Sequence, residues 1–242
     1  VVIDNGGDFR MKPEVPLVIP EINAKDIKKH KGIIANPNCS TIQMLVALNP
    51  IYKAAGLKRV IVSTFQAASG AGQAAVDELE SQTRAAVSGE ELPAPQALEK
   101  RIAFNLIPKI GGFSDDDYTS EEWKMVRESH KILHDNKIKI SATCVRVPVM
   151  NAHSEAVYLE TKDNLDCVRI RKLLAKAPGV KLVDDPKANA FTLPVEASGR
   201  DEVFVSRIRR DPFVKNGFWL WVVADNLRKG AATNAVQIAE YL

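Results

Sequence analysis

The feature that most constrains the fold is a set of four long segments in the second half of the chain. In each of them, apolar and polar residues mostly alternate. The segments read KISATCVRVPVM (139–150), SEAVYLETK (154–162), EVFVSRIRRD (202–211) and GFWLWVVADNL (217–227). Alternation places neighbouring side chains on opposite faces of a strand. We therefore predict a mixed sheet with one buried face and one face that is solvated or lies in an interface.

The first half of the chain has a different pattern, in which short strands alternate with helices. We predict short strands at 1–4, 16–19 and 31–34, a longer strand at 58–67, and helices at 23–30, 41–56, 72–89 and 120–136. A further helix at 165–177 and a small-residue helix at 230–242 complete the prediction. The pattern changes near residue 37 without a visible linker, so we predict an α/β protein with a boundary there.

Composition excludes several classes of protein. The 242 residues include 33 basic and 30 acidic side chains, and the net charge of +3 indicates a mixed surface rather than a nucleic-acid-binding one. The longest apolar runs are too short to span a membrane, and we see no signal peptide. Three cysteines without a Cys-x-x-Cys spacing argue against a disulfide framework or a zinc site. We expect a soluble protein of the reducing cytoplasm.

One of these cysteines, Cys39, lies in the sequence ANPNCST at 35–41. Pro37 and Asn38 impose a non-helical entry, so Cys39 would begin a helix, where free N–H groups and the helix dipole favour an anion. We expect a lowered thiol pKa and an N-terminal turn that faces the oxyanion of an attacked carbonyl. The alternative is a buried cysteine without a chemical role.

A partner for this thiol occurs in RVPVMNAHSE. Arg146 and His153 are seven residues apart, on a strand and at the start of the next, so both side chains are able to face one cleft. His153 is a candidate base for Cys39, because the pKa of histidine lies near neutrality. His130 and His134 are four residues apart on a helix, but HKILH lacks the glutamate of the metalloprotease motif, and we predict no metal site.

Several charged and small residues suit an anionic substrate and a nucleotide. Glu121 and Lys124 are three residues apart on one helix face, and Arg10 follows the opening turn. Each of these, taken alone, is better explained as a solvated charge or an ion pair. SGAG at 69–72 precedes a helix and allows close approach of a ligand, although it is not a Gly-x-Gly-x-x-Gly fingerprint.

Taken together, these motifs resemble those of the aspartate-semialdehyde dehydrogenase family. IIANPNCSTIQM resembles the family's nucleophile motif, FQAASGAG its glutamine and glycine segment, and EEWKM its substrate pair. RVPVMNAHSE resembles its arginine and histidine, and ADNLRKGAATNAVQIAE its C-terminal cofactor segment. The motifs follow the family's order, whereas the family's N-terminal glycine-rich turn has no counterpart. The resemblance implies that the chain corresponds to the C-terminal two thirds of the enzyme.

The resemblance also implies a fold and a division into domains. It implies a remnant of a Rossmann-like nucleotide-binding domain, joined to a mixed-sheet α+β catalytic and dimerisation domain like the C-terminal domain of glyceraldehyde-3-phosphate dehydrogenase. Residues 1–37 would be the remainder of the dinucleotide-binding domain, 38–225 the catalytic and dimerisation domain, and 226–242 a helix that returns to the first domain. A homodimer or homotetramer is implied, with no nucleic-acid or membrane partner.

The family reaction is the reversible reductive dephosphorylation of aspartyl β-phosphate to aspartate β-semialdehyde with NADPH, on the pathway to lysine, methionine and threonine. By resemblance, Cys39 forms a thioester, Gln66 positions the acyl group and His153 moves protons. The remaining roles also follow from the resemblance. Arg146 and Glu121 would bind the substrate carboxylate and amino group, and Lys124 and Arg10 its phosphate. Asn38 would also bind substrate, and Ser69, Gly70 and Asn226 would bind the NADP cofactor.

Some features depart from the family or leave alternatives open. Gly6 and Gly7 replace a usual pair of serines, and Asp8 adds a carboxylate where phosphates are expected. Without the N-terminal part, the chain alone is expected to be inactive with NADPH, and its choice between NADPH and NADH is open. The alternatives are an N-acetyl-glutamyl-phosphate reductase-like enzyme, a glyceraldehyde-3-phosphate dehydrogenase relative, a Cys-His hydrolase and a non-catalytic assembly module.

Overall fold

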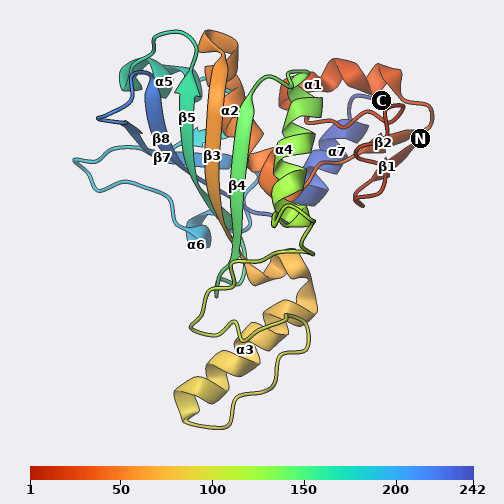
Figure 1. The fold of residues 1–242 in the computed structure, drawn as a ribbon, viewed down its shortest axis with the longest axis vertical. Helices are drawn as coiled ribbons and strands as arrows, with labels where there is room; N and C mark the ends of the chain where they lie inside the picture. The colour runs from red at the N-terminus through yellow and green to blue at the C-terminus, as the bar shows by residue number, and fades with distance from the viewer.

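A computed structural model describes all 242 residues, and its centre is a six-stranded mixed sheet (Figure 1). Its strands are β3 (Leu57–Gln66), β4 (Lys139–Arg146), β5 (His153–Thr161), β6 (Val180–Leu182), β7 (Val203–Arg210) and β8 (Gly217–Ala224). They lie in the order β4-β3-β5-β8-β7-β6, with parallel pairing of β3 to β4 and of β6 to β7, and antiparallel pairing elsewhere. The predicted mixed sheet is confirmed.

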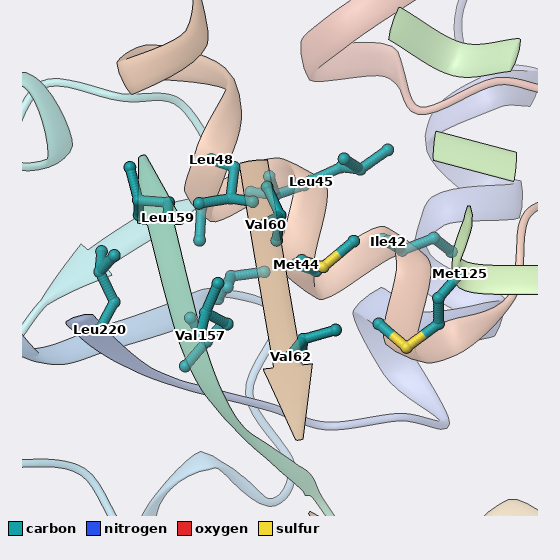
Figure 2. Close-up of a cluster of buried hydrophobic side chains, with 14 of the residues drawn as sticks. Ile42, Met44, Leu45, Leu48, Val60, Val62, Met125, Val157, Leu159 and Leu220 are labelled. Atoms are coloured by element: carbon teal, nitrogen blue, oxygen red, sulfur yellow. The ribbon is translucent and has the colours of Figure 1, made fainter. Parts of the chain in front are cut away.

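Helices cover one face of this sheet. They are α2 (Cys39–Ala55), α4 (Ser120–Leu133) and α5 (Cys167–Leu174). Figure 2 shows apolar side chains of α2, such as Leu45 and Leu48, packed against Val60 of β3 and Leu159 of β5. This contact is the main core of the molecule, because α2 is apolar on nearly all sides and is buried along most of its length.

The opposite face of the sheet carries aromatic side chains that stay partly exposed. Phe65 packs on Trp221 with ring centroids 5.6 Å apart, and Tyr158 packs on Trp219 at 5.1 Å. Ile61, on the same face of β3, is 42% exposed. Part of this face is covered by the segment around α6 (Pro194–Ala197).

A smaller unit precedes the large sheet. Parallel strands β1 (Val2–Asp4) and β2 (Ile33–Ala35) pair with each other, and α1 (Pro20–Asn23) and the 3-10 helix η1 (Ala24–Lys29) connect them. The strand predicted at 16–19 is wrong: only Leu17 makes a bridge, to Ala35, and α1 follows at once. Pro16 and Pro20 both lack an N–H group, which prevents a strand from forming between them.

The C-terminal segment packs against this smaller unit. A π-helical turn, η3 (Arg228–Ala232), leads into α7 (Thr233–Ala239), so the regular helix begins three residues later than predicted. Ile238 of α7 joins Val18, Ile27 and Ile34 in a small separate core. In Figure 1 the two chain ends lie near each other beside β1 and β2.

The helix α3 (Gln73–Ser88) extends away from the body of the protein, and the 3-10 turn η2 (Ala68–Ala71) precedes it (Figure 1). The long loop that follows α3 is attached by buried side chains of the helix. Glu78 accepts N–H groups from residues 96 and 97, and Gln82 accepts those from residues 102 and 103. None of the helices combines the length and apolar character that crossing a bilayer requires.

Candidate active site

A cavity of about 280 Å³ lies at the C-terminal ends of strands β3 and β4, where helix α2 begins. Gln66 is the last residue of β3, Arg146 the last residue of the parallel strand β4, and Cys39 the first residue of α2. All but one of the candidate residues line the cavity: Arg10, Asn38, Cys39, Gln66, Ser69, Gly70, Glu121, Lys124, Arg146 and Asn226. The exception is His153. The roles assigned to these residues remain predictions.

Cys39 is held at the start of α2 by its neighbour Asn38. The Asn38 side chain caps the helix, because its Oδ1 accepts the N–H groups of Ser40 at 3.1 Å and Thr41 at 3.2 Å. These two N–H groups are therefore occupied, which corrects the expectation that the whole first turn faces an oxyanion. The N–H of Cys39 itself has no acceptor within the chain, so it remains available to a substrate oxygen.

The surroundings of the Cys39 thiol overturn the expectation of a lowered pKa. Burial, followed by the negative charge of Glu121, raises the pKa of Cys39 to about 12, and the opposing charges of Arg146 and Arg10 do not compensate. Position at a helix N-terminus is a smaller effect than removal from water. The free thiol is thus protonated at neutral pH, and it must lose its proton as the substrate binds.

Glu121 is the centre of a hydrogen-bonded cluster on the wall of the cavity. Its Oε1 accepts from Asn38 Nδ2 at 2.8 Å and from Gln66 Nε2 at 3.1 Å, and its Oε2 pairs with Lys124 Nζ at 3.1 Å. Burial alone raises the pKa of Glu121, but Lys124 and the two amide donors outweigh it and leave the pKa below its ordinary value. Glu121 therefore presents a negative charge to the cavity. Gln66 also donates to Ser40 Oγ at 2.7 Å.

Arg146 contributes a positive charge that no acidic side chain neutralises. Its Nη1 donates to the backbone oxygen of Ala67 at 2.7 Å, and none of its nitrogens pairs with a carboxylate. The residue is only 5% exposed, and burial lowers the pKa of its guanidinium, although not enough to remove the charge. A buried guanidinium with unused donors at a cavity is a site for an anionic group.

His153 does not occupy the position predicted for the base of Cys39. The ring is fully buried, does not line the cavity and makes no hydrogen bond to Cys39. Its Nδ1 accepts the N–H of Ala67 at 3.0 Å, so the proton of the neutral ring lies on Nε2. Burial, and then the charge of Arg146, lower the pKa of His153 well below its ordinary value. In this arrangement His153 is a neutral hydrogen-bond donor.

The free Nε2 of His153 faces the Gly70 turn. A Cβ atom added at Gly70 would lie 2.9 Å from this nitrogen and 2.8 Å from Arg146 Nη1. Only glycine permits this close approach of the backbone. The Gly70 turn therefore separates His153 from the cavity, and the ring is one backbone layer away from it.

Arg10 is more constrained than the sequence suggested. Its guanidinium pairs with Glu128 Oε1 at 3.2 Å and donates to the backbone oxygens of Asn5 and Asn36. Glu128 Oε2 in turn accepts the N–H of Asn38 at 2.7 Å. Sequence reasoning missed Glu128, whose only signal was its position seven residues after Glu121, on the same side of α4.

The opening turn contributes Asn5 and Gly7 to the cavity lining, whereas the exposed Asp8 does not line it. The added carboxylate that the sequence placed near the phosphates therefore lies outside the cavity wall.

The residues assigned to cofactor binding form one side of the cavity. Asn226 Nδ2 donates to Ser69 Oγ at 3.0 Å, and its Oδ1 accepts the N–H of Ala152 at 3.0 Å. Gly70 and Gly230 also line the cavity, and a Cβ atom at either position would collide with a neighbouring side chain. Ser69, Gly70 and Asn226 thus offer a polar side-chain pair and a glycine turn beside Cys39, groups that suit a polar ring such as a nicotinamide.

The helical histidines have separate partners. His130 Nε2 contacts the backbone oxygen of Ile138 at 2.8 Å, and His134 Nε2 contacts Asp26 Oδ2 at 2.6 Å. No group of three or more potential metal ligands occurs in the structure.

Comparison with protein-family models identifies the class of protein to which this chain belongs. The family model described as semialdehyde dehydrogenase, dimerisation domain, matches residues 48–229, and the model described as semialdehyde dehydrogenase, NAD binding domain, matches residues 1–30. These two matches, together with Cys39 at the start of α2 on the cavity wall, define an oxidoreductase of the semialdehyde dehydrogenase class that uses a nicotinamide dinucleotide.

Individual relatives narrow this class. Aspartate-semialdehyde dehydrogenase of Aquifex aeolicus is 57% identical over the whole chain, which spans 72% of that relative's length, and the Bacillus subtilis enzyme is 53% identical with the same coverage. The crystal structure of aspartate semialdehyde dehydrogenase II from Vibrio cholerae, complexed with ASA, matches with a TM-score of 0.96 at 49% identity, over all of this chain and 72% of that one. The chain belongs to the aspartate-semialdehyde dehydrogenase family. The resemblance and the fold class predicted from sequence are confirmed.

Proposed function

We propose that this chain carries the catalytic site for the NADP-dependent, reversible reductive dephosphorylation of aspartyl β-phosphate to aspartate β-semialdehyde. The observation that carries the proposal is the pair of opposite buried charges on one cavity. Arg146 has donors without a carboxylate, and Glu121 is ionised beside it, with Cys39 on the same wall. A substrate with an α-carboxylate, an α-ammonium and a reactive acyl group one carbon further on complements all three groups.

In the first step, the Cys39 sulfur attacks the acyl carbon and a carbon–sulfur bond forms. The carbon–oxygen bond to phosphate breaks, and phosphate leaves with the bonding electrons and takes up the thiol proton as hydrogen phosphate. A thioester remains on Cys39. The N–H of Cys39, which has no acceptor within the chain, is the donor placed on the cavity wall to stabilise the oxyanion. For His153, which lies behind the Gly70 turn, the proton-moving role rests on the family resemblance. Gln66, fixed by Ser40 and Glu121, orients the acyl group.

The cofactor wall consists of Ser69, Gly70 and Asn226. These residues would hold a nicotinamide, which would supply the hydride for reduction of the Cys39 thioester to the aldehyde. Ser69 and Asn226 fix each other and the backbone at Ala152, so they present a preformed surface for the ring. The preference for NADP over NAD rests on the family resemblance.

The phosphate end of the substrate is assigned to Lys124 and Arg10, and Asn38 is assigned to substrate binding without a phosphate contact. The Lys124 side chain is 41% exposed and pairs only with Glu121, whereas Arg10 is buried and held by Glu128. Lys124 therefore supplies the charge that follows the departing phosphate, and Arg10 supplies a fixed positive potential.

The large sheet provides the surface for a homodimer or homotetramer, in keeping with the dimerisation domain that the family model describes. We also propose the division into residues 1–37, 38–225 and 226–242 as nucleotide-binding, catalytic and returning segments. Cytoplasmic location follows from the biosynthetic role.

The direct test of the proposed function is acylation of the chain without any cofactor. Aspartyl β-phosphate added to the protein should release inorganic phosphate in a burst of one equivalent and leave an aspartyl adduct on Cys39, which peptide mass spectrometry will locate. Cys39→Ser should give neither. An equal burst with N-acetyl-glutamyl phosphate would favour the N-acetyl-glutamyl-phosphate reductase-like alternative, but an acetylated nitrogen has no charge for Glu121 to bind. Absence of any adduct on Cys39 would refute the proposal.

A further inference from the structure

Lys229 is a fully buried lysine that no part of the reaction scheme uses. It lies in η3, beside the cavity wall, and its side chain is 0% exposed. Burying an ammonium group costs several kcal/mol unless every N–H finds an acceptor. A charge retained there at this cost needs a physical explanation.

Every donor of this ammonium has a partner. Lys229 Nζ lies 2.7 Å from Glu21 Oε1, 2.9 Å from Asn234 Oδ1 and 2.6 Å from Gln237 Oε1. Glu21 belongs to α1 in the smaller unit, whereas the two amides belong to α7. Burial lowers the pKa of Lys229, and the neighbouring Glu21 opposes this shift. Lys229 therefore fastens the C-terminal segment to α1.

The network continues to the loop that carries the nucleophile. Asn234 Nδ2 donates to Asn36 Oδ1, and Asn36 Nδ2 donates to the backbone oxygen of Ala231 at 3.1 Å. Asn36 stands three residues before Cys39 in the sequence. One set of hydrogen bonds thus fixes both the nucleophile loop and the turn that faces it.

The turn itself packs directly on the nucleophile. A Cβ atom added at Gly230 would lie 2.8 Å from Cys39 Cβ, so the backbone at Gly230 is in contact with Cys39. The turn is π-helical, with Gly230 N–H bonded to the oxygen of Asp225 and Ala232 N–H bonded to that of Leu227, each five residues earlier. Such wide turns are rare in proteins as a whole, and those that occur are often located at functional sites.

We propose that Lys229 is a positioning residue: its ammonium, fixed on Glu21, holds the π-helical turn so that Gly230 and Ala231 close the cavity wall against Cys39. The turn sets how deeply the thiol is covered and where the substrate lies relative to sulfur. A neutral side chain of similar length fills the space but does not specify the position, because apolar contacts lack direction. This inference rests on the proposed function only for its acylation measurement.

The test compares Lys229→Met with the double variant Glu21→Met/Lys229→Met. Replacement of a buried ion pair by two apolar residues is often neutral for stability, whereas loss of one partner is not. We expect the single variant to melt at a lower temperature and the double variant to recover most of the loss. Both variants should acylate Cys39 at least about tenfold more slowly than the unmodified chain.

A second measurement separates positioning from general loosening. Iodoacetamide labelling at pH 8, followed site by site, should modify Cys39 at least about threefold faster in both variants, because a turn that moves off the thiol lets water reach it and lowers its pKa. Cys144, buried in the core, should stay protected, since only global unfolding exposes it. Gly230→Ala should also slow acylation, because the added carbon meets Cys39.

The matched control is Arg171→Met. Arg171, on α5, pairs through Nε with the Asp184 side chain at 2.7 Å, and neither residue lines the cavity. Arg171→Met should lower the melting temperature. It should leave the rates of acylation and of iodoacetamide labelling at Cys39 within about twofold of those of the unmodified chain. If the Lys229 variants also keep both rates within twofold, the inference is wrong. If the unmodified chain is not acylated at all, the proposed function fails, and labelling still decides the role of Lys229.

Discussion

The Cys39 thiol is held in its neutral form by burial and by Glu121, and this gives a testable pH dependence. Because the pKa is about 12, iodoacetamide labelling of Cys39 should keep rising with pH from 7 to 10 without a plateau. Glu121→Gln removes the second of the two causes, so it should increase labelling at pH 8 by roughly threefold or more. Site-resolved mass spectrometry measures both rates. A plateau near pH 8 in the original chain would contradict the raised pKa.

Arg146 should not tolerate replacement by lysine. The guanidinium of Arg146 is planar and buried, and no carboxylate of the chain pairs with it, so it is free to make two parallel hydrogen bonds to a substrate carboxylate. The ammonium group of a lysine cannot reproduce this two-bond geometry. Arg146→Lys should weaken the transition state for acylation of Cys39 by roughly 2 to 4 kcal/mol, measured as phosphate release at low substrate concentration. His153→Ala should instead reduce the acylation rate at saturation. A change of less than twofold for Arg146→Lys would exclude the carboxylate-binding role.

Glu155 is a buried carboxyl group whose effect on stability depends on pH. It lies on β5 opposite Thr64, and its carboxyl oxygens lack close partners. Burial raises the pKa of Glu155 well above its ordinary value, and the nearby Gln43 amide opposes this only in part. The folded chain holds the proton more tightly than the unfolded one, so stability is fully present below the ordinary pKa and falls as pH rises toward the folded pKa.

Glu155→Gln should therefore remove this pH dependence. The variant should melt at a temperature close to that of the original chain near pH 5 and at a higher temperature near pH 8.5, because an amide never ionises. Thermal unfolding across this range provides the measurement. Equal pH profiles for the two proteins would show that Glu155 does not change its ionisation on folding.

The N-terminus of α2 links helix stability to the cavity. Asn38 caps two N–H groups of α2 and also donates to Glu121. Asn38→Ala should lower the free energy of unfolding by about 1 to 2 kcal/mol and should release Glu121 from one of its donors. Asn105→Ala, which removes only an exposed contact to the backbone at Arg101, should change it by less than about 0.5 kcal/mol. Urea denaturation compares the two, and similar losses would show that the cap is unimportant.

At the level of the assembled protein, the aromatic face of the large sheet should control association. Trp219 and Trp221 stay partly exposed on β8, next to the exposed Ile61. A charge introduced there would have to be desolvated in an interface. Trp219→Glu should shift the protein toward monomer in sedimentation velocity at micromolar concentration, whereas Phe113→Glu, away from this sheet, should not. Unchanged association of Trp219→Glu would place the subunit interface elsewhere.

Local patterns of apolar and polar residues in the sequence predicted much of the architecture. The period of two at 154–162 and 217–227 predicted β5 and β8, and the run from 41 to 56 predicted α2 in spite of Pro50. The Pro37–Asn38 entry located the first turn of that helix, and the family motifs identified the residues that surround the cavity. These signals are local, because they depend on alternation, capping and backbone restriction within a few residues.

Other properties arose only when distant segments came together. The pairing of Arg10 with Glu128 spans 118 positions, and that of Lys229 with Glu21 spans 208. The raised pKa of Cys39, which is half-buried, depends on partial withdrawal of the thiol from water and on the charge of Glu121, 82 residues away. The donor role of His153 depends on the N–H of Ala67, 86 residues away. The sequence could therefore predict which groups make up the site. Burial and long-range contacts set the protonation state of these groups and whether each donates or accepts hydrogen bonds. Desolvation and pairing between distant residues leave no pattern in the local sequence.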